Sequence, residues 1–257
     1  MNITCGVRSG ESGLVSFDKG IRCLFIIATC NRVKPMERLQ KDFDHIAVLS
    51  ERESDIGGIY DGYLLNFVPA LCRRALEVGC GTATFTRQLA KRADQVIAID
   101  LSSEMIRVAR ERSALHPNID FTVGNVLEMD LAASQFDCIV MIATLHHLPT
   151  EDVLKKLKHS LTPGGVLILH DLLRPAGLLD RLADVVRLPI SVAVSWLRTR
   201  RLWAKPEVRK AWAEHGKNER YLTKREVQAM RDGYLQEGDV KYHLLWRYTI
   251  VWRKPAA

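Results

Sequence analysis

Several features are missing from this chain of 257 residues, and each absence excludes a class of protein. No apolar run approaches the roughly 20 residues that a transmembrane helix needs. The short run at 24–28 is too far from the N-terminus for the h-region of an ordinary signal peptide. None of the six cysteines forms a C-x-x-C pair, which argues against a redox or zinc motif. We therefore expect a protein of the reducing cytoplasm.

The most informative pattern is a short apolar strand that ends in an acid and continues into a glycine-rich turn. Residues 74–84 read RALEVGCGTAT. Glycine lacks the Cβ atom that would block close approach, so such a turn can present backbone N–H groups and a helix N-terminus to a polar ligand. Dinucleotide-binding folds use G-x-G-x-x-G here, with Gly or Ala last. In this chain Gly79 and Gly81 fit that pattern, but Thr84 does not.

Four further apolar runs follow in order, and most end at a polar residue or a turn. They are Gln95–Asp100, Ile119–Val123, Phe136–Ala143 and Val166–Asp171. Near-continuous apolar runs are typical of strands buried on both faces of a parallel sheet. Helical stretches are predicted between them at 84–93, 102–115 and 150–161. This alternation predicts a doubly wound α/β domain.

The end of the chain predicts a different kind of strand pairing. A helix is expected at 223–231, followed by strands at 240–244 and 247–252. No helix fits between the last two strands, so they must be antiparallel. Ligands of such folds bind at the carboxyl ends of the parallel strands. Polar or small residues stand at those ends: Gly79, Asp100, Asn125, Thr144 and Asp171.

These motifs resemble those of class I S-adenosylmethionine (SAM) methyltransferases of the generic small-molecule type. The family pattern E-x-G-x-G-x-G is matched at Glu77, Gly79 and Gly81 and missed at Ala83. Asn125 stands where the family usually has Asp. The resemblance extends over about residues 43–254. It implies a mostly parallel, seven-stranded, Rossmann-like sheet, SAM as co-substrate, and in-line methyl transfer to a small, largely apolar acceptor.

The resemblance also implies which residues form the site. Asp100 lies 19 residues after Gly81, where α/β nucleotide sites place a carboxylate on ribose hydroxyls. Tyr63 falls where relatives place a tyrosine near the SAM carboxylate, and its alternative role is core packing. The expected cofactor-binding residues are Glu77, Gly79, Cys80, Gly81, Asp100, Leu101, Asn125, Val126, Ile142 and Tyr63.

Histidines at strand ends are the candidate catalytic groups if the acceptor must lose a proton. His146 and His170 are our two candidates, because both lie near the carboxyl ends of predicted strands. The alternative for the His146–His147 pair is structural: orienting its loop and packing under the sheet. Neither this pair nor His170–Asp171 has a third ligand at a sensible sequence spacing, so no metal site is predicted.

The chain divides into an extension and one domain. Residues 1–35 match no family motif, and we expect this extension to add nothing to catalysis; the alternative is a short strand, Cys23–Thr29, that docks on the domain. Residues 36–257 are expected to form the methyltransferase domain. Within it, 174–222 is expected to form a helical cap over the strand ends.

The expected cap carries the net charge of the protein. Residues 174–225 contain 13 lysines and arginines against 5 acids, whereas the whole chain has a net charge of +7. Long apolar stretches interrupt the basic residues. Three interpretations remain: an ordinary amphipathic helical pair, a cap helped by contact with an anionic membrane surface, or nucleic-acid binding. Phosphate contacts do not require the apolar stretches, so we favour a cap that covers a small-molecule acceptor.

Three other functions compete with methyl transfer to a small molecule. A nicotinamide-dependent oxidoreductase is disfavoured by Thr84 and by the lack of a Tyr-x-x-x-Lys pair. A SAM-binding protein without transfer activity is kept open by the departures at Ala83 and Asn125. An RNA methyltransferase is a further alternative, although no recognised nucleic-acid module accompanies the basic segment.

Overall fold

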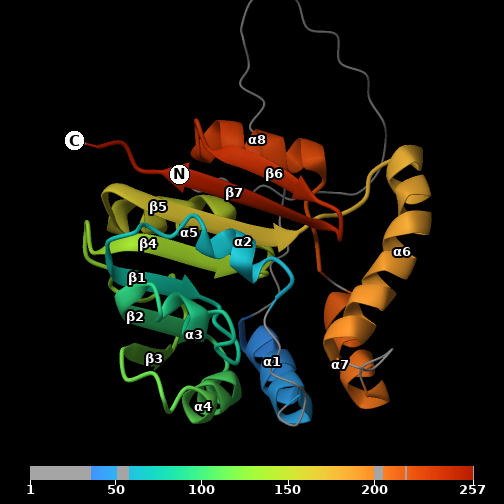
Figure 1. Cartoon of the computed structure of the whole chain (residues 1–257), viewed down its shortest axis with the longest axis horizontal. Helices are drawn as coiled ribbons and strands as arrows, with labels where there is room; N and C mark the ends of the chain where they lie inside the picture. The colour runs from blue at the N-terminus through green and yellow to red at the C-terminus, as the bar shows by residue number, and fades with distance from the viewer. Residues whose placement is uncertain (1–35, 51–57, 200–204, 218, 257) are drawn as a thin grey trace, which may run out of the picture. The chain divides into compact units, whose positions relative to one another are not determined.

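The computed structural model describes residues 36–50, 58–199, 205–217 and 219–256 (Figure 1). The expectations for residues 1–35, including a strand at Cys23–Thr29, lie outside these described residues. Among the described helices, none is both long and apolar enough to cross a membrane.

Strands and helices alternate along most of the chain, as the apolar runs predict. The strands are β1 (Cys72–Val78), β2 (Ala93–Asp100), β3 (Ile119–Val123), β4 (Phe136–Ile142), β5 (Leu161–Leu172), β6 (Asp239–His243) and β7 (Arg247–Arg253). The helices are α1 (Met36–Ser50), α2 (Asp61–Leu65), α3 (Thr86–Leu89), α4 (Ser103–Arg112), α5 (Thr150–Ser160), α6 (Leu178–Thr199), α7 (Pro206–Gly216) and α8 (Lys224–Tyr234). A short 3-10 helix, η1 (Leu145–His147), follows β4.

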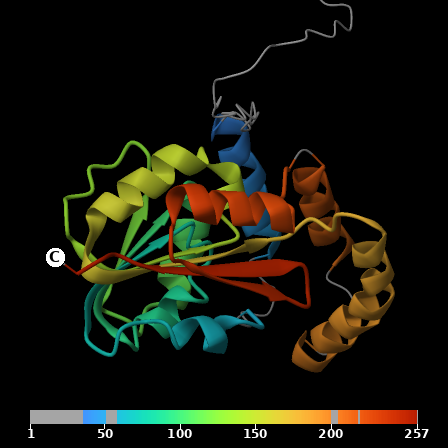
Figure 2. The same cartoon turned by 90° about the horizontal axis from the view of Figure 1, so that it is seen from above.

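The strands form one seven-stranded sheet in the order β3-β2-β1-β4-β5-β7-β6. The first five pair in parallel, and β7 is antiparallel to both β5 and β6. This confirms the predicted doubly wound, mostly parallel sheet and its antiparallel final pair. The carboxyl ends of the parallel strands lie on the side of the sheet where α1, α6 and α7 are found (Figures 1 and 2).

Alternate residues of the strands pack against two separate helical layers. Leu76, Ile139 and Leu167 face the core beneath α5 and α8. Their neighbours Ala75 and Val166 face the core beneath α2, α3 and α4. Because both faces are covered, the central parts of these strands are mostly apolar, as expected for a parallel sheet.

Two parts of the helical layers differ from the sequence prediction. The predicted helix at 84–93 is only α3, four residues long, because the glycine-rich turn extends before it and β2 already begins at Ala93. An additional helix, α1, packs against α4 and α7. The α1 residues Ile46 and Ala47 form a small buried cluster with Met105 of α4 and Ala211 of α7.

Helix α6 departs from the expectation that the apolar residues of 174–222 are buried under the cap. Its amphipathic sequence forms one long helix, but one apolar side is exposed to solvent. The exposed residues are Leu182, Val185, Val186, Leu188, Trp196 and Leu197. One contact of the helix with the rest of the domain is polar: Trp246 Nε1 donates a hydrogen bond to Asp184 Oδ1 over 2.8 Å.

The glycine-rich turn contains a strained residue at the position where the family pattern has glycine. Ala83 is fully buried and has a φ of 63°. A left-handed conformation costs a residue with a Cβ atom roughly 1–2 kcal/mol. Glycine avoids this cost. Its greater freedom in the unfolded chain, however, destabilises the folded chain by about 0.5–1 kcal/mol and offsets part of the gain.

We therefore expect Ala83→Gly to raise the free energy of unfolding by up to about 1 kcal/mol, because it removes left-handed strain. Chemical denaturation measures the change. Ala98→Gly is the matched control, since Ala98 is equally buried but lies in the extended strand β2. That control should destabilise the protein. Equal destabilisation by both substitutions would contradict the strain at Ala83.

Candidate active site

A cavity of about 310 Å³ lies at the carboxyl ends of the parallel strands. Its wall on the sheet side contains the ends of β1, β2 and β4 and the loop after β3: Val78, Gly79, Gly81, Thr82, Ile99, Asp100, Leu101, Gly124, Asn125, Val126, Ile142, Ala143 and Thr144. The other wall is mostly apolar and comes from α1, α4, the η1 region and α7: Met36, Leu39, Phe43, Ile46, Met105, His147, Leu148 and Trp212.

The shape of the sheet-side wall depends on Gly79. This residue has a φ of +75°, and a Cβ atom on it would lie 2.2 Å from Thr144 Oγ1. The backbone N–H groups of Gly79 and Cys80 both donate to the carbonyl of Ile99, over 2.8 and 3.0 Å. The end of β1 therefore approaches β2 and the loop after β4 too closely for any larger residue.

Asp100 is the buried carboxylate of this wall. Its Oδ2 accepts a hydrogen bond from the Gly81 N–H over 2.8 Å, and its Oδ1 accepts one from the Ser102 N–H over 2.9 Å. Burial raises the pKa of Asp100, while these N–H groups favour the anion. The acid thus ties the glycine-rich turn to the start of α4.

Of the other expected cofactor-binding residues, some line the cavity and some do not. Leu101, Asn125, Val126 and Ile142 line it, and Asn125 Oδ1 also accepts from the Leu127 N–H over 3.0 Å. Glu77, Cys80 and Tyr63 are not part of the wall.

These three residues have other surroundings. Glu77 is buried, which raises its pKa to about 8. Cys80 is also buried, and its thiol lies 3.7 Å from the Gly81 carbonyl oxygen. The Tyr63 ring packs against Phe67 and His243, in line with its alternative role in core packing.

The two candidate catalytic histidines lie in different environments, and neither lines the cavity. His170 is buried in β5, where its Nδ1 lies 2.9 Å from Thr249 Oγ1 and its ring contacts Tyr60 and His243. Burial, together with the charge of Arg247, lowers the pKa of His170 to about 3. A neutral, enclosed imidazole suits packing of the sheet better than proton transfer at the cavity.

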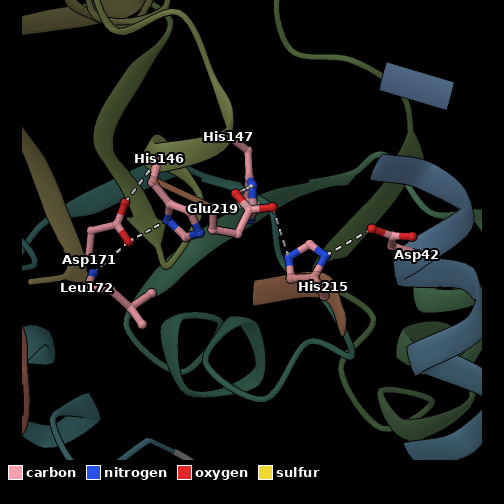
Figure 3. Close-up of polar contacts among 7 residues, drawn as sticks. All are labelled: Asp42, His146, His147, Asp171, Leu172, His215 and Glu219. Atoms are coloured by element: carbon pink, nitrogen blue, oxygen red, sulfur yellow. Dashed lines mark hydrogen bonds and ion pairs between the residues drawn. The ribbon is translucent and has the colours of Figure 1, made fainter. Parts of the chain in front are cut away.

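His146 belongs to a cluster of histidines and carboxylates next to the cavity (Figure 3). Its Nδ1 lies 2.8 Å from Asp171 Oδ1, and its backbone N–H donates to Asp171 Oδ2 over 3.1 Å. Burial opposes ionisation of Asp171, but the charge and hydrogen bond of His146 outweigh it and lower the pKa of this acid. Asp171 therefore fixes the orientation of the His146 ring.

His147, the next residue, connects this cluster to the cavity wall. Its Nδ1 lies 3.0 Å from Glu219 Oε2, and Glu219 Oε1 lies 3.8 Å from His215 Nε2. His215 Nδ1 in turn lies 3.4 Å from Asp42 Oδ2 on α1. Burial is the main cause that lowers the pKa of His147.

Sequence reasoning missed several residues of the site. Phe43 and Trp212 lie in helices distant in sequence from the glycine-rich turn, and no motif marks them. The sequence spacing indicated no third metal ligand near His146 and His147. In the folded chain Glu219, which is distant in sequence, lies beside both histidines and is a potential third ligand. The hydrophobic spacing of α1 was the one available signal for the apolar wall.

Comparison with known proteins finds methyltransferase relatives. Residues 75–165 match the family model described as a methyltransferase domain. An uncharacterised methyltransferase of Mycobacterium tuberculosis is 33% identical over 118 residues, which cover 46% of this chain and 59% of the relative. A ubiquinone biosynthesis O-methyltransferase of Xanthomonas campestris is 33% identical over 150 residues, which cover 52% of this chain and 62% of the relative. The chain thus spans about six tenths of the length of these curated relatives.

Solved structures share the fold at low sequence identity. The N-methyltransferase NodS from Bradyrhizobium japonicum, in complex with S-adenosyl-L-homocysteine, is 17% identical with a TM-score of 0.51, over 76% of this chain and 86% of that one. Phosphoethanolamine N-methyltransferase 1 from Haemonchus contortus is 13% identical with a TM-score of 0.55, over 86% of this chain and 49% of that one. The [4+2]-cyclase SpnF is 16% identical with a TM-score of 0.54, over 88% and 98%.

The sheet order, the glycine-rich turn and these matches define a Rossmann-like methyltransferase domain. Residues 75–165 are similar to the methyltransferase domain, and the fold of the chain is that of Rossmann-like methyltransferases.

The enclosed position of His170 predicts an acid-sensitive fold. Its pKa is about 3 in the folded chain against 6.5 for the ordinary side chain, so between these values the unfolded chain binds a proton that the folded chain does not. The free energy of unfolding should therefore fall as the pH falls below about 6.5. From this group alone the loss at pH 5 is about 2 kcal/mol.

His170→Asn should make this pH dependence shallower, although it also removes a packed ring. Urea denaturation at several pH values between 5 and 7 gives the slopes of the parent and the variant. Identical slopes would mean that His170 is protonated in the folded protein.

Proposed function

We propose that the protein transfers a methyl group from SAM to a small, largely apolar acceptor by in-line displacement. The observation that carries this proposal is the composition of one cavity. Its sheet-side wall has the glycine-rich turn, Asp100 and Asn125, and its opposite wall has apolar side chains that include Phe43 and Trp212. A polar nucleoside such as SAM and an apolar acceptor can therefore share a single cavity.

Residues of the sheet-side wall fit SAM by their chemistry. Gly79 has no Cβ atom, which leaves room for a ligand at the strand end. Asp100 supplies a carboxylate that can accept hydrogen bonds from ribose hydroxyls. Asn125 has an amide oxygen that can accept from an adenine amino group once it is released from Leu127. No part of this fit requires the glycine that Ala83 replaces.

Catalysis in this arrangement depends on positioning. SAM supplies an activated methyl group on a sulfonium. The chain's part is to align the acceptor with that group and exclude water, and alignment of this kind contributes about 7–11 kcal/mol. The apolar side chains of α1 and α7 suit the exclusion of water. We place the acceptor next to His147, the histidine on the cavity wall. The ring of His146 packs against the ring of His147.

The proposed acceptor is a chemical class: small, largely apolar molecules. Relatives named for ubiquinone biosynthesis and for a malonyl-[acyl-carrier protein] share about a third of their aligned residues with this chain. Since those names describe different acceptors, the shared part of the sequence does not select one. The apolar wall of the cavity favours an acceptor that buries carbon surface.

Binding and transfer can be tested with a pair of glycine variants. The parent should bind SAM and not NAD in titration calorimetry, and it should label a component of a metabolite extract from methyl-labelled SAM. Gly79→Ala should lose at least tenfold in SAM affinity, because its Cβ atom would overlap Thr144. Gly233→Ala is the control, since a Cβ atom there meets nothing within 4 Å. NAD binding, or SAM binding without any labelled product, would contradict the proposal.

We also propose that α6 contacts an anionic membrane surface. Its exposed apolar residues recur at spacings of three and four, so Leu182, Val186 and Trp196 lie on one side of the helix. The surrounding segment, 174–225, has 13 basic residues against 5 acidic ones. A helix that combines an apolar face with basic residues is typical of interfacial binding.

Vesicle flotation tests this contact. The parent should float with vesicles that contain phosphatidylserine and much less with pure phosphatidylcholine. Val186→Glu should reduce the bound fraction several-fold, because a charge would enter the apolar face. Leu115→Glu is the control at another exposed leucine, 91% accessible, outside α6. Equal flotation of the parent and Val186→Glu would rule out the α6 face.

A further inference from the structure

Three side chains from two separate parts of the chain gather beside the cavity with the composition of a metal site. His146 and His147 come from η1, and Glu219 comes from the connection between α7 and α8. One ligand atom from each lies within 4.8 Å of the other two. The three side chains are 5–6% exposed, so this is a buried group and not a surface cluster of acids.

The hydrogen bonds around the cluster orient its imidazoles. Asp171 occupies Nδ1 of His146, which leaves Nε2 of that ring for a ligand. Asp42 likewise lies at Nδ1 of His215, whose Nε2 points toward Glu219 (Figure 3). Histidines that bind metals have this arrangement, in which a carboxylate holds the nitrogen that is not coordinated.

The distances are close to those that a metal needs. Two ligands about 2.1 Å from a tetrahedral zinc ion are about 3.4 Å apart. His147 Nδ1 and Glu219 Oε2 lie 3.0 Å apart, and the widest separation among the three ligand atoms is within 4.8 Å. Small side-chain rotations therefore suffice to bring all three atoms into coordination distance.

The charges also favour a cation. Asp171 and Glu219 are both almost enclosed, and each has an imidazole nitrogen within 3.0 Å. The charge of the half-buried Arg247 also acts on Asp171. A buried carboxylate is costly unless it is paired with positive charge or coordinates a metal. A divalent ion would supply that charge while the imidazoles remain neutral ligands.

We propose that His146, His147 and Glu219 bind a divalent transition-metal ion of the zinc class at the edge of the cavity. Two imidazoles and one carboxylate form a donor set that zinc accepts, with further positions left for water or substrate. His215 is the next donor, because its Nε2 lies 3.8 Å from Glu219 Oε1.

The position of the ion would matter for the acceptor. His147 belongs to both the cluster and the cavity wall, so a metal there would lie next to the acceptor. A metal-bound oxygen or sulfur loses its proton more readily, which would prepare an acceptor for methylation. This last step rests on the proposed function, whereas metal binding itself does not.

Metal analysis of the full-length, untagged protein tests the site without any activity assay. We expect about one equivalent of zinc in the purified protein, or after chelation and addition of Zn²⁺, together with a higher melting temperature than the chelated protein. Replacement by Co²⁺ should give visible absorption bands of a four- or five-coordinate ion. Less than a tenth of an equivalent under both conditions, with no shift in melting temperature, would overturn the proposal.

Variants assign the ion to this cluster. Glu219→Gln preserves the shape of the side chain and should weaken Zn²⁺ binding at least tenfold, as should His147→Gln. Asp171→Asn should weaken it about 10- to 100-fold, the range seen for groups that orient a metal-bound histidine. His170→Asn, at a buried histidine outside the cluster, should bind as the parent does.

The metal-binding measurements on these variants separate the possible outcomes. Parent-like binding by both Glu219→Gln and His147→Gln would place the metal elsewhere and overturn the proposal, as would equal loss in His170→Asn. Circular dichroism confirms that each variant is folded. If metal binds as expected but no methyl transfer is found, the proposed function fails and the metal site stands.

Discussion

The carboxylate of Asp100 joins the parts of the chain that must meet for a site to exist. It accepts hydrogen bonds from the Gly81 N–H in the turn after β1 and from the Ser102 N–H at the start of α4. The Ser102 hydroxyl in turn donates to Asp44 of α1. A single buried acid therefore fixes the glycine-rich turn, the end of β2 and, through one further residue, the helix that forms the opposite wall of the cavity.

The two walls of the cavity differ in how they are built. The sheet-side wall consists of strand ends, where backbone groups and short polar side chains are held in place by the hydrogen bonds of the sheet. The opposite wall consists of helices joined to the sheet by side chains, and its apolar contacts include a cluster of Ile46 and Ala47 with Met105 and Ala211. No strand pairing constrains the second wall.

The sequence predicted the parts of the fold that depend on local pattern. Apolar runs located the parallel strands, and Gly79, Gly81 and Asp100 marked the strand ends that line the cavity. It did not predict that Glu77, Cys80 and Tyr63 are outside the wall, because a family motif identifies a position in the chain and not the direction of its side chain. Glu219 and Trp212 reach the site only through the path of α7, which no spacing rule describes.

Stability and orientation at the cavity come from different interactions. Apolar contacts between α1, α4 and α7 supply burial, but they have little directional preference. The polar contacts from His147 through Glu219 and His215 to Asp42 connect η1, the α7–α8 connection, α7 and α1 over distances of 3.0, 3.8 and 3.4 Å. A network of this kind is favourable only when its members are satisfied together, since each unsatisfied buried group is costly. The orientation of the apolar wall, and with it the space left for an acceptor, is thus set by the histidine–carboxylate cluster more than by the apolar contacts around it.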